Sequence, residues 1–333
     1  MNNNLEISET STGKRIDVFL VDNDIFPSRT SAQAYIKQNK VKVNGKPVKK
    51  NYVLQRNDCI EHEPYTEDEQ HVLPEDIPLD IRYENENMLV ISKQPGLICH
   101  PTSRHTAGTL VNALLYLYGK EKLCNVDEND VRYGVVHRLD SNTSGLMMCA
   151  KTDACAHALI DMLRRHNVDR RYICLVHGQI KETSGKIDVP LCRDKNVRNK
   201  RMVGYDDDYR DAITTFNVIK RYASNNLDAG YTLVECRLHT GRTHQIRAHM
   251  EYIGHPVVGD TMYCKGLNKQ QMRALGLKRQ FLHSYYLNFT EPISGHNIEM
   301  KDRLNDDLLA AISKIEDRCV YDCDEISDFE GVL

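Results

Sequence analysis

Over residues 76–315, the apolar residues of some segments have the spacing of a strand and those of other segments have the spacing of a helix. The two kinds of segment do not alternate regularly along the chain. Residues 233–238 alternate as a half-buried strand does, with Val234 facing one side and Glu235 facing the other. After Thr152 the apolar residues instead repeat in helical pairs, and a second helical pattern follows Thr109. A doubly wound fold needs strands and helices in alternation, so the sequence predicts an α+β fold rich in antiparallel strands.

The N-terminal region differs from the rest of the chain in charge. Residues 13–62 contain ten Lys or Arg and five Asp or Glu, a balance of +5, whereas the whole chain of 333 residues has a formal net charge of −3. Helical spacing begins at residues 15–21, and Ser28 or Thr30 is placed to cap a second helix. An Asn-Gly dipeptide within residues 43–48 then predicts a hairpin. We therefore expect a small basic domain over residues 13–62.

Composition divides the remainder of the chain. Residues 63–75 are acidic and flanked by proline, which predicts a linker, and residues 76–315 are long enough for a large domain with its own core. Residues 316–333 are acidic with little periodicity, so we expect a disordered tail of no assigned role. The chain shows no long apolar run and no signal-peptide pattern, and its eleven cysteines form no Cys-x-x-Cys pair. These features predict a cytoplasmic protein without membrane association, whose cysteines are free and reduced.

One carboxylate, Asp140, lies between an apolar run and a polar turn. Residues 135–139 read as a strand-like segment, and residues 141–145 read as a tight turn. A side chain held between two such segments has little freedom to move, which is what a reacting carboxylate needs. The alternative is structural, because Arg138 and Asp140 could form an ion pair at the end of a strand while Asx and Thr side chains close the turn.

The residues around Asp140 favour a catalytic role over the structural one. The string HRLDSNTSGL, residues 137–146, resembles the HRLDxxTSGL signature of the RluA/RluD-type pseudouridine synthases. Three more segments resemble family motifs in the same order along the chain: LVISKQPGLICHP at 89–101, RRYICLVHG at 170–178 and HTGRTHQIRAHMEYIGHPVVGD at 239–260. The resemblance covers about residues 75–295. It implies the pseudouridine synthase fold, with a long, bent, mostly antiparallel mixed sheet, flanking helices and an RNA cleft.

The order helix, helix and hairpin in the basic region resembles the alpha-L RNA-binding module shared with ribosomal small-subunit protein four. The resemblance implies that residues 13–62 bind RNA. The cationic candidates for this contact are Arg29, Lys37, Lys42 and Lys46. A lysine-rich face that is merely solvated is the alternative, and it would be preferred for an isolated run of charge.

Pseudouridine formation detaches uracil from the ribose, turns the base and rejoins it through a ring carbon. The reaction involves no net oxidation and loses no group, so we expect no cofactor, no nucleotide and no metal. The resemblance assigns the central step to Asp140; addition to the base, addition to the sugar and a glycal route remain open. Arg247, on a helix beginning near Thr243, is the expected cationic partner that keeps Asp140 ionised. Tyr172 is expected to stack on uracil while its hydroxyl helps to move a proton.

Further residues are expected to contact RNA. A stacked uridine must be extruded at a cost of roughly a few kcal/mol, and Arg138 is placed to brace the gap that it leaves. Residues 193–201 look like a basic loop that binds phosphate. The candidates from this loop and from the third motif are Arg198, Lys200, Arg201, Arg242 and His244. The chain departs modestly from the family at Gln94, Arg210 and Phe216, which bears on substrate detail more than on reaction type.

Two rival chemistries fit the residues less well. The histidines at 239, 244 and 249 recur every five residues, which on a helix puts the last two about 140° apart and off a common metal-binding face. A hydrolase built from Ser144, His137 and Asp140 would lack the Gly-x-Ser-x-Gly elbow. We therefore expect a monomeric isomerase acting on structured RNA, with large-subunit ribosomal RNA favoured. The alternatives are a synthase acting on transfer RNA and a noncatalytic RNA-binding or ribosome-assembly factor.

Overall fold

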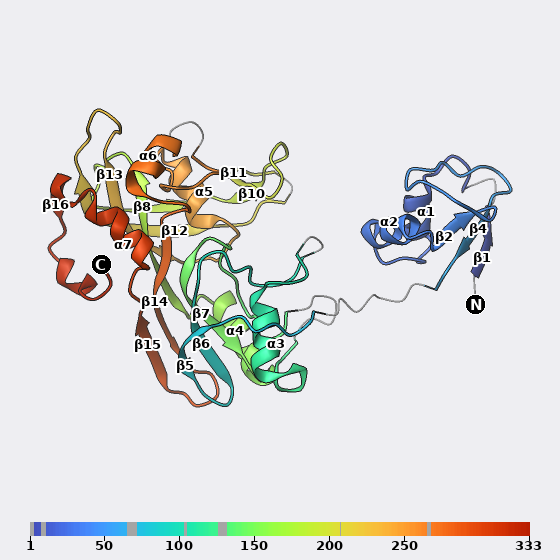
Figure 1. Ribbon diagram of the computed structural model, residues 1–333, viewed down its shortest axis with the longest axis horizontal. Coiled ribbons are helices and arrows are strands. Elements are labelled where there is room, and N and C mark those ends of the chain that lie inside the picture. Colours follow the sequence, from blue (N-terminus) through green and yellow to red (C-terminus); the bar gives the residue numbers. More distant parts are fainter. Residues whose placement is uncertain are drawn as a thin grey trace. The chain divides into compact units, whose positions relative to one another are not determined.

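The computed structural model forms two compact units, residues 1–71 and residues 72–333 (Figure 1). The structure describes residues 3–7, 11–64, 72–102, 105–125, 132–206, 208–264 and 268–333. The predicted linker at 63–75 lies largely outside the described residues. The division of the chain nevertheless falls within that linker, at residue 71.

The N-terminal unit packs two helices against a small antiparallel sheet of order β1-β4-β2-β3. Its elements are β1 (Asn3–Glu6), α1 (Ile16–Asp22), α2 (Arg29–Lys37), β2 (Val41–Val43), β3 (Lys46–Pro47) and β4 (Cys59–His62). The Ser28 hydroxyl accepts the Ser31 backbone N–H and caps α2, as predicted. Asn44 and Gly45 both have positive φ, as a two-residue hairpin turn requires. The predicted order of two helices and a hairpin is confirmed.

The larger unit is built on one ten-stranded sheet of order β16-β12-β13-β8-β14-β7-β6-β5, with β15 beside β14 and β9 beside β12. Its strands are β5 (Asp80–Glu84), β6 (Met88–Lys93), β7 (Ser144–Ala150), β8 (Asp169–His177), β9 (Ser184–Asp188), β12 (Ile213–Tyr222), β13 (Tyr231–Leu238), β14 (Leu282–Thr290), β15 (Asn297–Lys301) and β16 (Cys319–Asp322). Every named pair in it is antiparallel except β14 with β7. A separate hairpin joins β10 (Leu191–Arg193) to β11 (Arg201–Val203). The mostly antiparallel mixed sheet is the one expected.

Helices cover both faces of this sheet (Figure 1). They are α3 (Leu110–Tyr118), α4 (Asp153–Arg164), α5 (Gln245–Tyr252), α6 (Asn268–Leu275) and α7 (Asp306–Ser313), with 3-10 turns η2 (Lys120–Lys122), η3 (Glu316–Arg318) and η4 (Ile326–Phe329). Helices α3 and α5 share one hydrophobic cluster with Cys174 of β8, whereas α7 shares another with its neighbour Ile173. Successive strand residues point to opposite faces, so the two clusters lie on opposite sides of the sheet. The two predicted helices are confirmed: α3 follows Thr109 and α4 follows Thr152, and the side chain of each threonine caps its helix.

Strand β13 differs from its prediction, because both of its faces are buried. Glu235, expected to face solvent, is only 7% exposed. The hydroxyl of Tyr285 donates to its carboxylate, and Arg171 lies 3.5 Å from it. A period of two identifies a strand, but it does not reveal a second covering layer whose polar groups satisfy a buried charge.

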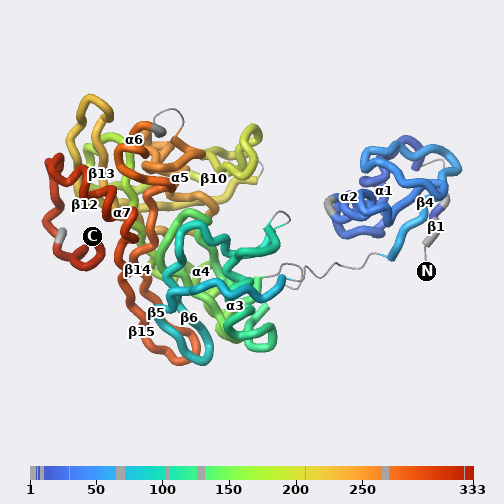
Figure 2. Tube along the Cα trace, viewed as in Figure 1, coloured from blue at the N-terminus to red at the C-terminus, as the bar shows by residue number. Residues whose placement is uncertain are grey.

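The expectation of a disordered tail is wrong. Residues 316–333 form η3, β16 and η4, and β16 pairs with β12 at the edge of the sheet (Figure 2). Phe329 and Val332 are 8% and 1% exposed in the cluster that contains α7. Arg318 anchors the segment on Asp228 and on the carbonyl of Ala223. Its apolar residues are few and irregularly spaced, yet they complete a core formed by distant parts of the chain.

Two further findings concern composition. All eleven cysteines are unpaired, and eight of them are buried. None of the helices in the described ranges has the length and apolar character needed to cross a lipid bilayer.

Candidate active site

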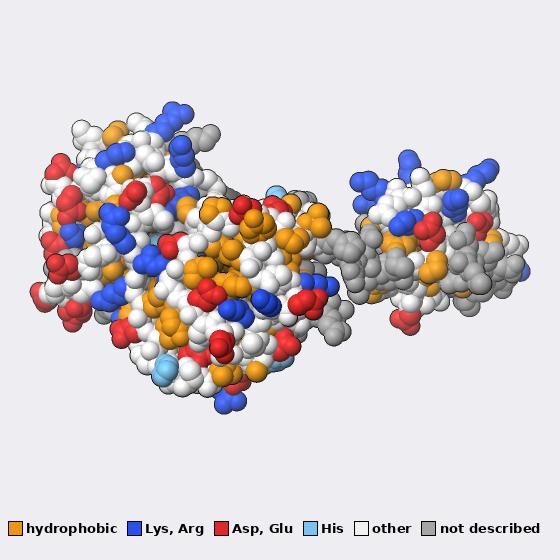
Figure 3. Space-filling view, turned by 60° about the horizontal axis from the view of Figure 1, so that its bottom comes forward, with side chains coloured by type: hydrophobic (Ala, Val, Ile, Leu, Met, Phe, Trp, Pro, Cys, Tyr) orange, Lys and Arg blue, Asp and Glu red, His pale blue; other side chains and the backbone are white. Residues whose placement is uncertain are grey.

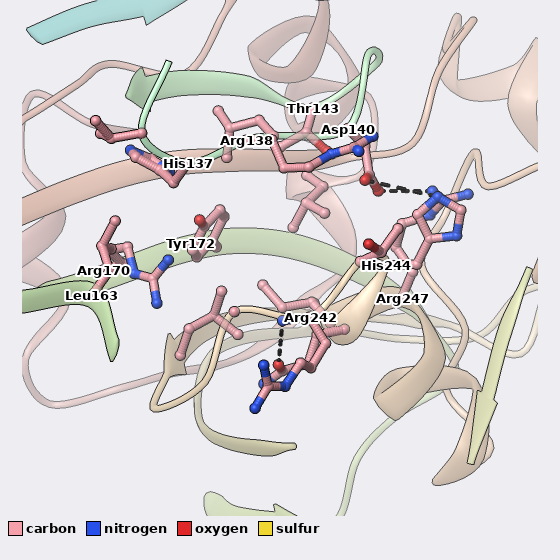
Figure 4. Close-up of a pocket in the computed structure, with 18 of the residues that line it drawn as sticks. His137, Arg138, Asp140, Thr143, Leu163, Arg170, Tyr172, Arg242, His244 and Arg247 are labelled. Carbon is pink, nitrogen blue, oxygen red and sulfur yellow. Dashed lines mark hydrogen bonds and ion pairs between the residues drawn. The ribbon is translucent and has the colours of Figure 1, made fainter. Parts of the chain in front are cut away.

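A pocket of about 400 Å³ lies where three segments distant in sequence meet. Asp140 comes from the turn before β7, Tyr172 from β8 and Arg247 from α5, and all three line it (Figure 4). The lining residues include five arginines and a single carboxylate: Arg138, Arg164, Arg170, Arg242, Arg247 and Asp140. A pocket of this size suits a nucleotide, and its excess of cations suits an anionic ligand.

The turn that carries Asp140 is held by its backbone carbonyls. The Thr143 N–H donates to the carbonyl of Asp140 at 3.0 Å, which closes the turn. The ammonium of Lys93 donates to the carbonyl of Ser141 at 2.9 Å, and the Gly96 N–H donates to the same oxygen at 2.8 Å. These bonds fix the backbone of the turn and with it the position of Asp140. Residues 136–139, which were expected to form a strand, form an irregular segment.

Lys93 is an internal brace of this turn. Its side chain is fully buried, and its ammonium also donates to the carbonyls of Gln94 and Leu97, both at 3.0 Å. Burial lowers its pKa to about 8, and the charge of Asp140 opposes that shift. Lys93 belongs to the motif at residues 89–101, but the sequence alone assigns it no role. Three carbonyl acceptors around one ammonium make it a residue that positions the Asp140 turn.

The strand after the turn passes unusually close to β14. Gly145 has φ of +106°, and a Cβ built on it would lie 2.2 Å from the carbonyl oxygen of Ser284. This close approach occurs in the parallel pair of β7 with β14, where Ser144 is opposite His283. Only glycine fits here. The packing holds the turn before β7 against the centre of the sheet.

Arg247 joins Asp140 to a second, fully buried carboxylate. Its Nη1 donates to Asp140 Oδ2 at 2.8 Å, while its Nε and Nη2 donate to the two oxygens of Asp260 at 2.6 and 3.0 Å. Burial lowers the pKa of the guanidinium, but the hydrogen bonds and charges of the two aspartates outweigh it and raise that pKa overall. Asp260 is 0% exposed and also accepts backbone N–H groups of Met262 and Tyr263. Asp260 is the last residue of the motif at 239–260, but the sequence alone assigns it no function.

His244 lies on the other side of Asp140. It precedes α5 with φ of +57°, and its Nε2 is 3.8 Å from Asp140 Oδ1 (Figure 4). Its Nδ1 is 3.1 Å from the hydroxyl oxygen of Tyr263, whose ring also faces Arg247. Burial lowers the pKa of His244, Asp140 opposes this shift and Arg247 adds to it. The imidazole is therefore neutral near pH 7.

Tyr172 lines the pocket from the centre of the sheet. Tyr172 is 4% exposed, and it lies opposite Ser284 on the neighbouring strand β14. Burial raises the pKa of its hydroxyl, and the charge of Arg170 opposes that shift. The hydroxyl therefore keeps its proton at neutral pH, and the ring presents an aromatic surface to the pocket.

The other predicted contacts near the pocket divide into exposed and buried residues. Arg138 and Arg242 are exposed at the rim, and the Nε of Arg242 donates to the carbonyl of Asp211. Arg198 is exposed between β10 and β11, and Arg201 is half-buried, 3.5 Å from Asp208.

Lys200 differs from the expectation of an exposed loop cation. Its side chain is 8% exposed, and its ammonium lies 3.0 Å from a carboxylate oxygen of Glu251. The same ammonium lies 4.8 Å from the centroid of the Tyr263 ring. It therefore supports the wall behind the pocket.

The candidate cations of the N-terminal unit are at its surface. Lys37, Lys42 and Lys46 are exposed, and Figure 3 shows Lys and Arg side chains along one edge of this unit. Arg29 is also exposed, but it pairs with the buried Asp17 at 3.0 Å. Arg29 therefore has a structural partner besides any ligand.

The hydrolase alternative fails on geometry. The Ser144 hydroxyl lies 2.9 Å from Nδ1 of His283, not beside His137, and both Ser144 and His283 are 0% exposed. The Nε2 of His137 instead accepts the backbone N–H of Met148 at 3.0 Å. No substrate reaches such a serine. Within the described ranges, no group of three or more His, Cys, Asp or Glu side chains is arranged to hold a metal ion.

Comparisons with known sequences identify the family and the N-terminal domain. The family described as RNA pseudouridylate synthase matches residues 87–252, and the S4 domain matches residues 14–60. An "Uncharacterized RNA pseudouridine synthase" of Bacillus subtilis is 38% identical over 308 residues, which cover 92% of this chain and 96% of that protein. A "Ribosomal large subunit pseudouridine synthase D" of Xanthomonas campestris is 35% identical over 320 residues, which cover 93% and 92%.

Solved structures agree on the fold. Human RNA Pseudouridylate Synthase Domain Containing 1 matches with a TM-score of 0.55 at 23% identity, over 70% of this chain and 87% of that one. Human RNA Pseudouridylate Synthase Domain Containing 4 matches with a TM-score of 0.54 at 21% identity, over 71% and 93%. With these relatives and this pocket, the chain belongs to the RNA pseudouridine synthases, isomerases that convert uridine in RNA to pseudouridine, and it carries an N-terminal S4 domain.

Proposed function

We propose that this enzyme isomerises specific uridines of large-subunit ribosomal RNA, with Asp140 as the catalytic residue. The observation that carries the proposal is the chain of contacts from Asp140 through Arg247 to Asp260, at the wall of a pocket that also holds Tyr172. Relatives named for the ribosomal large subunit over more than nine-tenths of their length support this RNA as the target.

Asp140 is suited to act on the sugar or the base of a bound uridine. Arg247 occupies one of its oxygens, Oδ2, while Oδ1 faces His244 at 3.8 Å and is the oxygen left for the substrate. The guanidinium holds this carboxylate through a charge-assisted hydrogen bond from Nη1 to Oδ2, at 2.8 Å. Asp260 keeps that guanidinium oriented, so the reactive oxygen is held in one direction.

Tyr172 and Arg138 act on the base and on the RNA, respectively. The ring of Tyr172 stacks on the uracil, and its protonated hydroxyl takes part in the proton transfer at the ring carbon. The exposed Arg138 braces the gap that the extruded base leaves in the RNA. Arg242, Arg198 and Arg201 add cationic contacts to the backbone.

The N-terminal S4 domain holds the substrate RNA through its basic surface. Lys37, Lys42 and Lys46 neutralise phosphates without reading sequence, and Arg29 contributes from the start of α2. The enzyme acts as a monomer in the cytoplasm, where its RNA is made and assembled.

Pseudouridine mapping in cells tests the target. We expect at least one pseudouridine of large-subunit ribosomal RNA to disappear when the gene is deleted and to return with the wild-type gene but not with Asp140→Asn. Loss of pseudouridine from transfer RNA alone would identify the other class of substrate. Restoration by Asp140→Asn would contradict the catalytic assignment.

A further inference from the structure

Arg170 is a buried cation without a counterion. It lies on β8, two residues before Tyr172 and on the same face of the strand, and it lines the pocket. It is 7% exposed, and its Nε finds no hydrogen-bond partner among the residues that the structure describes. Figure 4 shows its guanidinium turned toward the interior of the pocket, and no described carboxylate pairs with it. A buried guanidinium is normally paired, so this one lacks a partner that a ligand could supply.

His137 provides a second donor without an acceptor. Its Nε2 accepts the Met148 N–H, so the neutral ring carries its proton on Nδ1. Nδ1 is buried with almost no accessible surface, and none of the described residues provides it with a hydrogen-bond partner. Burial and the charge of Arg170 lower the pKa of His137 to about 3, so the ring stays neutral while it lies close to that guanidinium. Both groups line the same pocket.

Gly241 leaves the space that the guanidinium uses. A Cβ at this position would lie 3.1 Å from Nη1 and 3.3 Å from Nη2 of Arg170. A side chain at position 241 would therefore have to displace the guanidinium by a few tenths of an ångström, so Gly241 leaves Arg170 free to keep its present place at the pocket wall. An unmade hydrogen bond at a buried donor costs about 1–3 kcal/mol, which favours a site completed by its ligand.

We propose that Arg170, with the neutral ring of His137 in the same pocket wall, forms a subsite for one phosphodiester group of the RNA, adjacent to the uridine held by Asp140 and Tyr172. A phosphodiester carries a full negative charge and two oxygens that match the two edges of a guanidinium. A uracil carbonyl is neutral and would leave the charge of Arg170 uncompensated. The inference rests on the proposed placement of the uridine in this pocket.

Salt dependence of RNA binding by Arg170→Met tests the subsite. The variant keeps the apolar stem of the side chain and removes its charge. The probe is an in vitro transcript of large-subunit ribosomal RNA, and affinity is measured over a range of salt concentrations. We expect the slope of log affinity against log salt to fall in magnitude by about 0.7–0.9, the effect of one phosphate contact. Arg303→Met, which removes an exposed arginine outside the pocket lining, is the matched control and should leave the slope unchanged.

Stability separates this role from a structural one. Because the free protein leaves the guanidinium unpaired, Arg170→Met should unfold at the same urea concentration as the wild type or a higher one. Arg170→Lys, which keeps the charge but loses the fork, should keep the wild-type slope and bind more weakly. An unchanged slope for Arg170→Met, with or without a loss of stability, would overturn the subsite.

The same transcript, labelled with tritium at carbon five of uridine, separates the two proposals. Failure of the wild-type enzyme to release tritium from it would contradict the ribosomal target, while the slopes still decide the subsite. A lower rate of tritium release by Arg170→Met with an unchanged slope would indicate a contact to the base and overturn the phosphate assignment.

Discussion

Asp260→Asn tests whether the second carboxylate positions Arg247 for catalysis. The substitution removes the buried charge that receives two guanidinium hydrogen bonds, at 2.6 and 3.0 Å, and leaves Asp140 as the only anionic partner of Arg247 among these contacts. Loss of one partner from a buried ion pair costs about 3–5 kcal/mol, and asparagine keeps one acceptor oxygen, so we expect the free energy of unfolding to fall by about 2–4 kcal/mol. A guanidinium free to shift by about 1 Å should lower the rate of tritium release roughly 100-fold.

Urea denaturation and tritium release from RNA labelled at carbon five of uridine measure the two effects. Asp228→Asn is the matched control, because Asp228 forms a largely buried pair with Arg318 and neither residue lines the pocket. It should lose comparable stability and keep its rate under conditions where both proteins are folded. An Asp260→Asn enzyme that is destabilised but works within twofold of the wild-type rate would refute the positioning role.

Three further predictions concern the pocket, the S4 domain and pH. Tyr172→Phe should bind RNA normally but release tritium about 100-fold or more slowly, because it loses a group placed for proton transfer; a rate near wild type would remove that role. Replacing Lys42 and Lys46 together by Gln should flatten the salt dependence of RNA affinity, and equal slopes would exclude them as phosphate contacts. Burial lowers the pKa of His137 and His283 to about 3, whereas the ordinary pKa of a histidine is 6.5. Below pH 6.5 the unfolded chain therefore binds more protons than the folded protein. The free energy of unfolding should be complete above pH 6.5 and decline as pH falls toward 3, by at most about 1.4 kcal/mol per histidine per pH unit; a urea midpoint equal at pH 7 and pH 5 would contradict this.

Elements governed by local chemistry could be predicted from the sequence. A hydroxyl at Ser28, Thr109 or Thr152 caps the helix that follows because its partner lies three residues away. The Asn44-Gly45 turn likewise depends on the backbone preferences of two residues. In each case the sequence pattern contains the complete interaction.

Features formed by distant segments were harder to predict. The pairing of Arg247 with Asp140 spans 107 positions and was expected only through the resemblance. Asp260 and Lys93 both belong to family motifs, but the sequence does not show what they contact. Folding brings Asp260 to the guanidinium of Arg247, and it brings Lys93 to three backbone carbonyls. Phe329 was expected in a disordered tail for the same reason, because the core that buries it comes from residues far back in the chain.

The RNA-binding candidates show the same limit at the level of single side chains. Arg198 and Lys200 are two positions apart in one basic run, yet one is exposed and the other is buried beside Glu251. Charge in a sequence indicates where cations gather, but the packing around each one decides which of them meets solvent. Arg170 is the opposite case, because it lies outside that basic run and yet the fold buries its Nε without an acceptor beside the pocket.

Single-turnover tritium release by Asp140→Asn is the most direct measurement of the central claim that Asp140 is the reacting carboxylate. The variant keeps the shape of the side chain and one acceptor for Arg247 while removing the charge. Asp306→Asn, at a side chain that is 92% exposed, serves as the control. We predict that Asp140→Asn binds RNA with wild-type affinity and releases no tritium, whereas the control behaves as the wild type. Tritium release by Asp140→Asn at a rate within tenfold of the wild-type rate would contradict the mechanism.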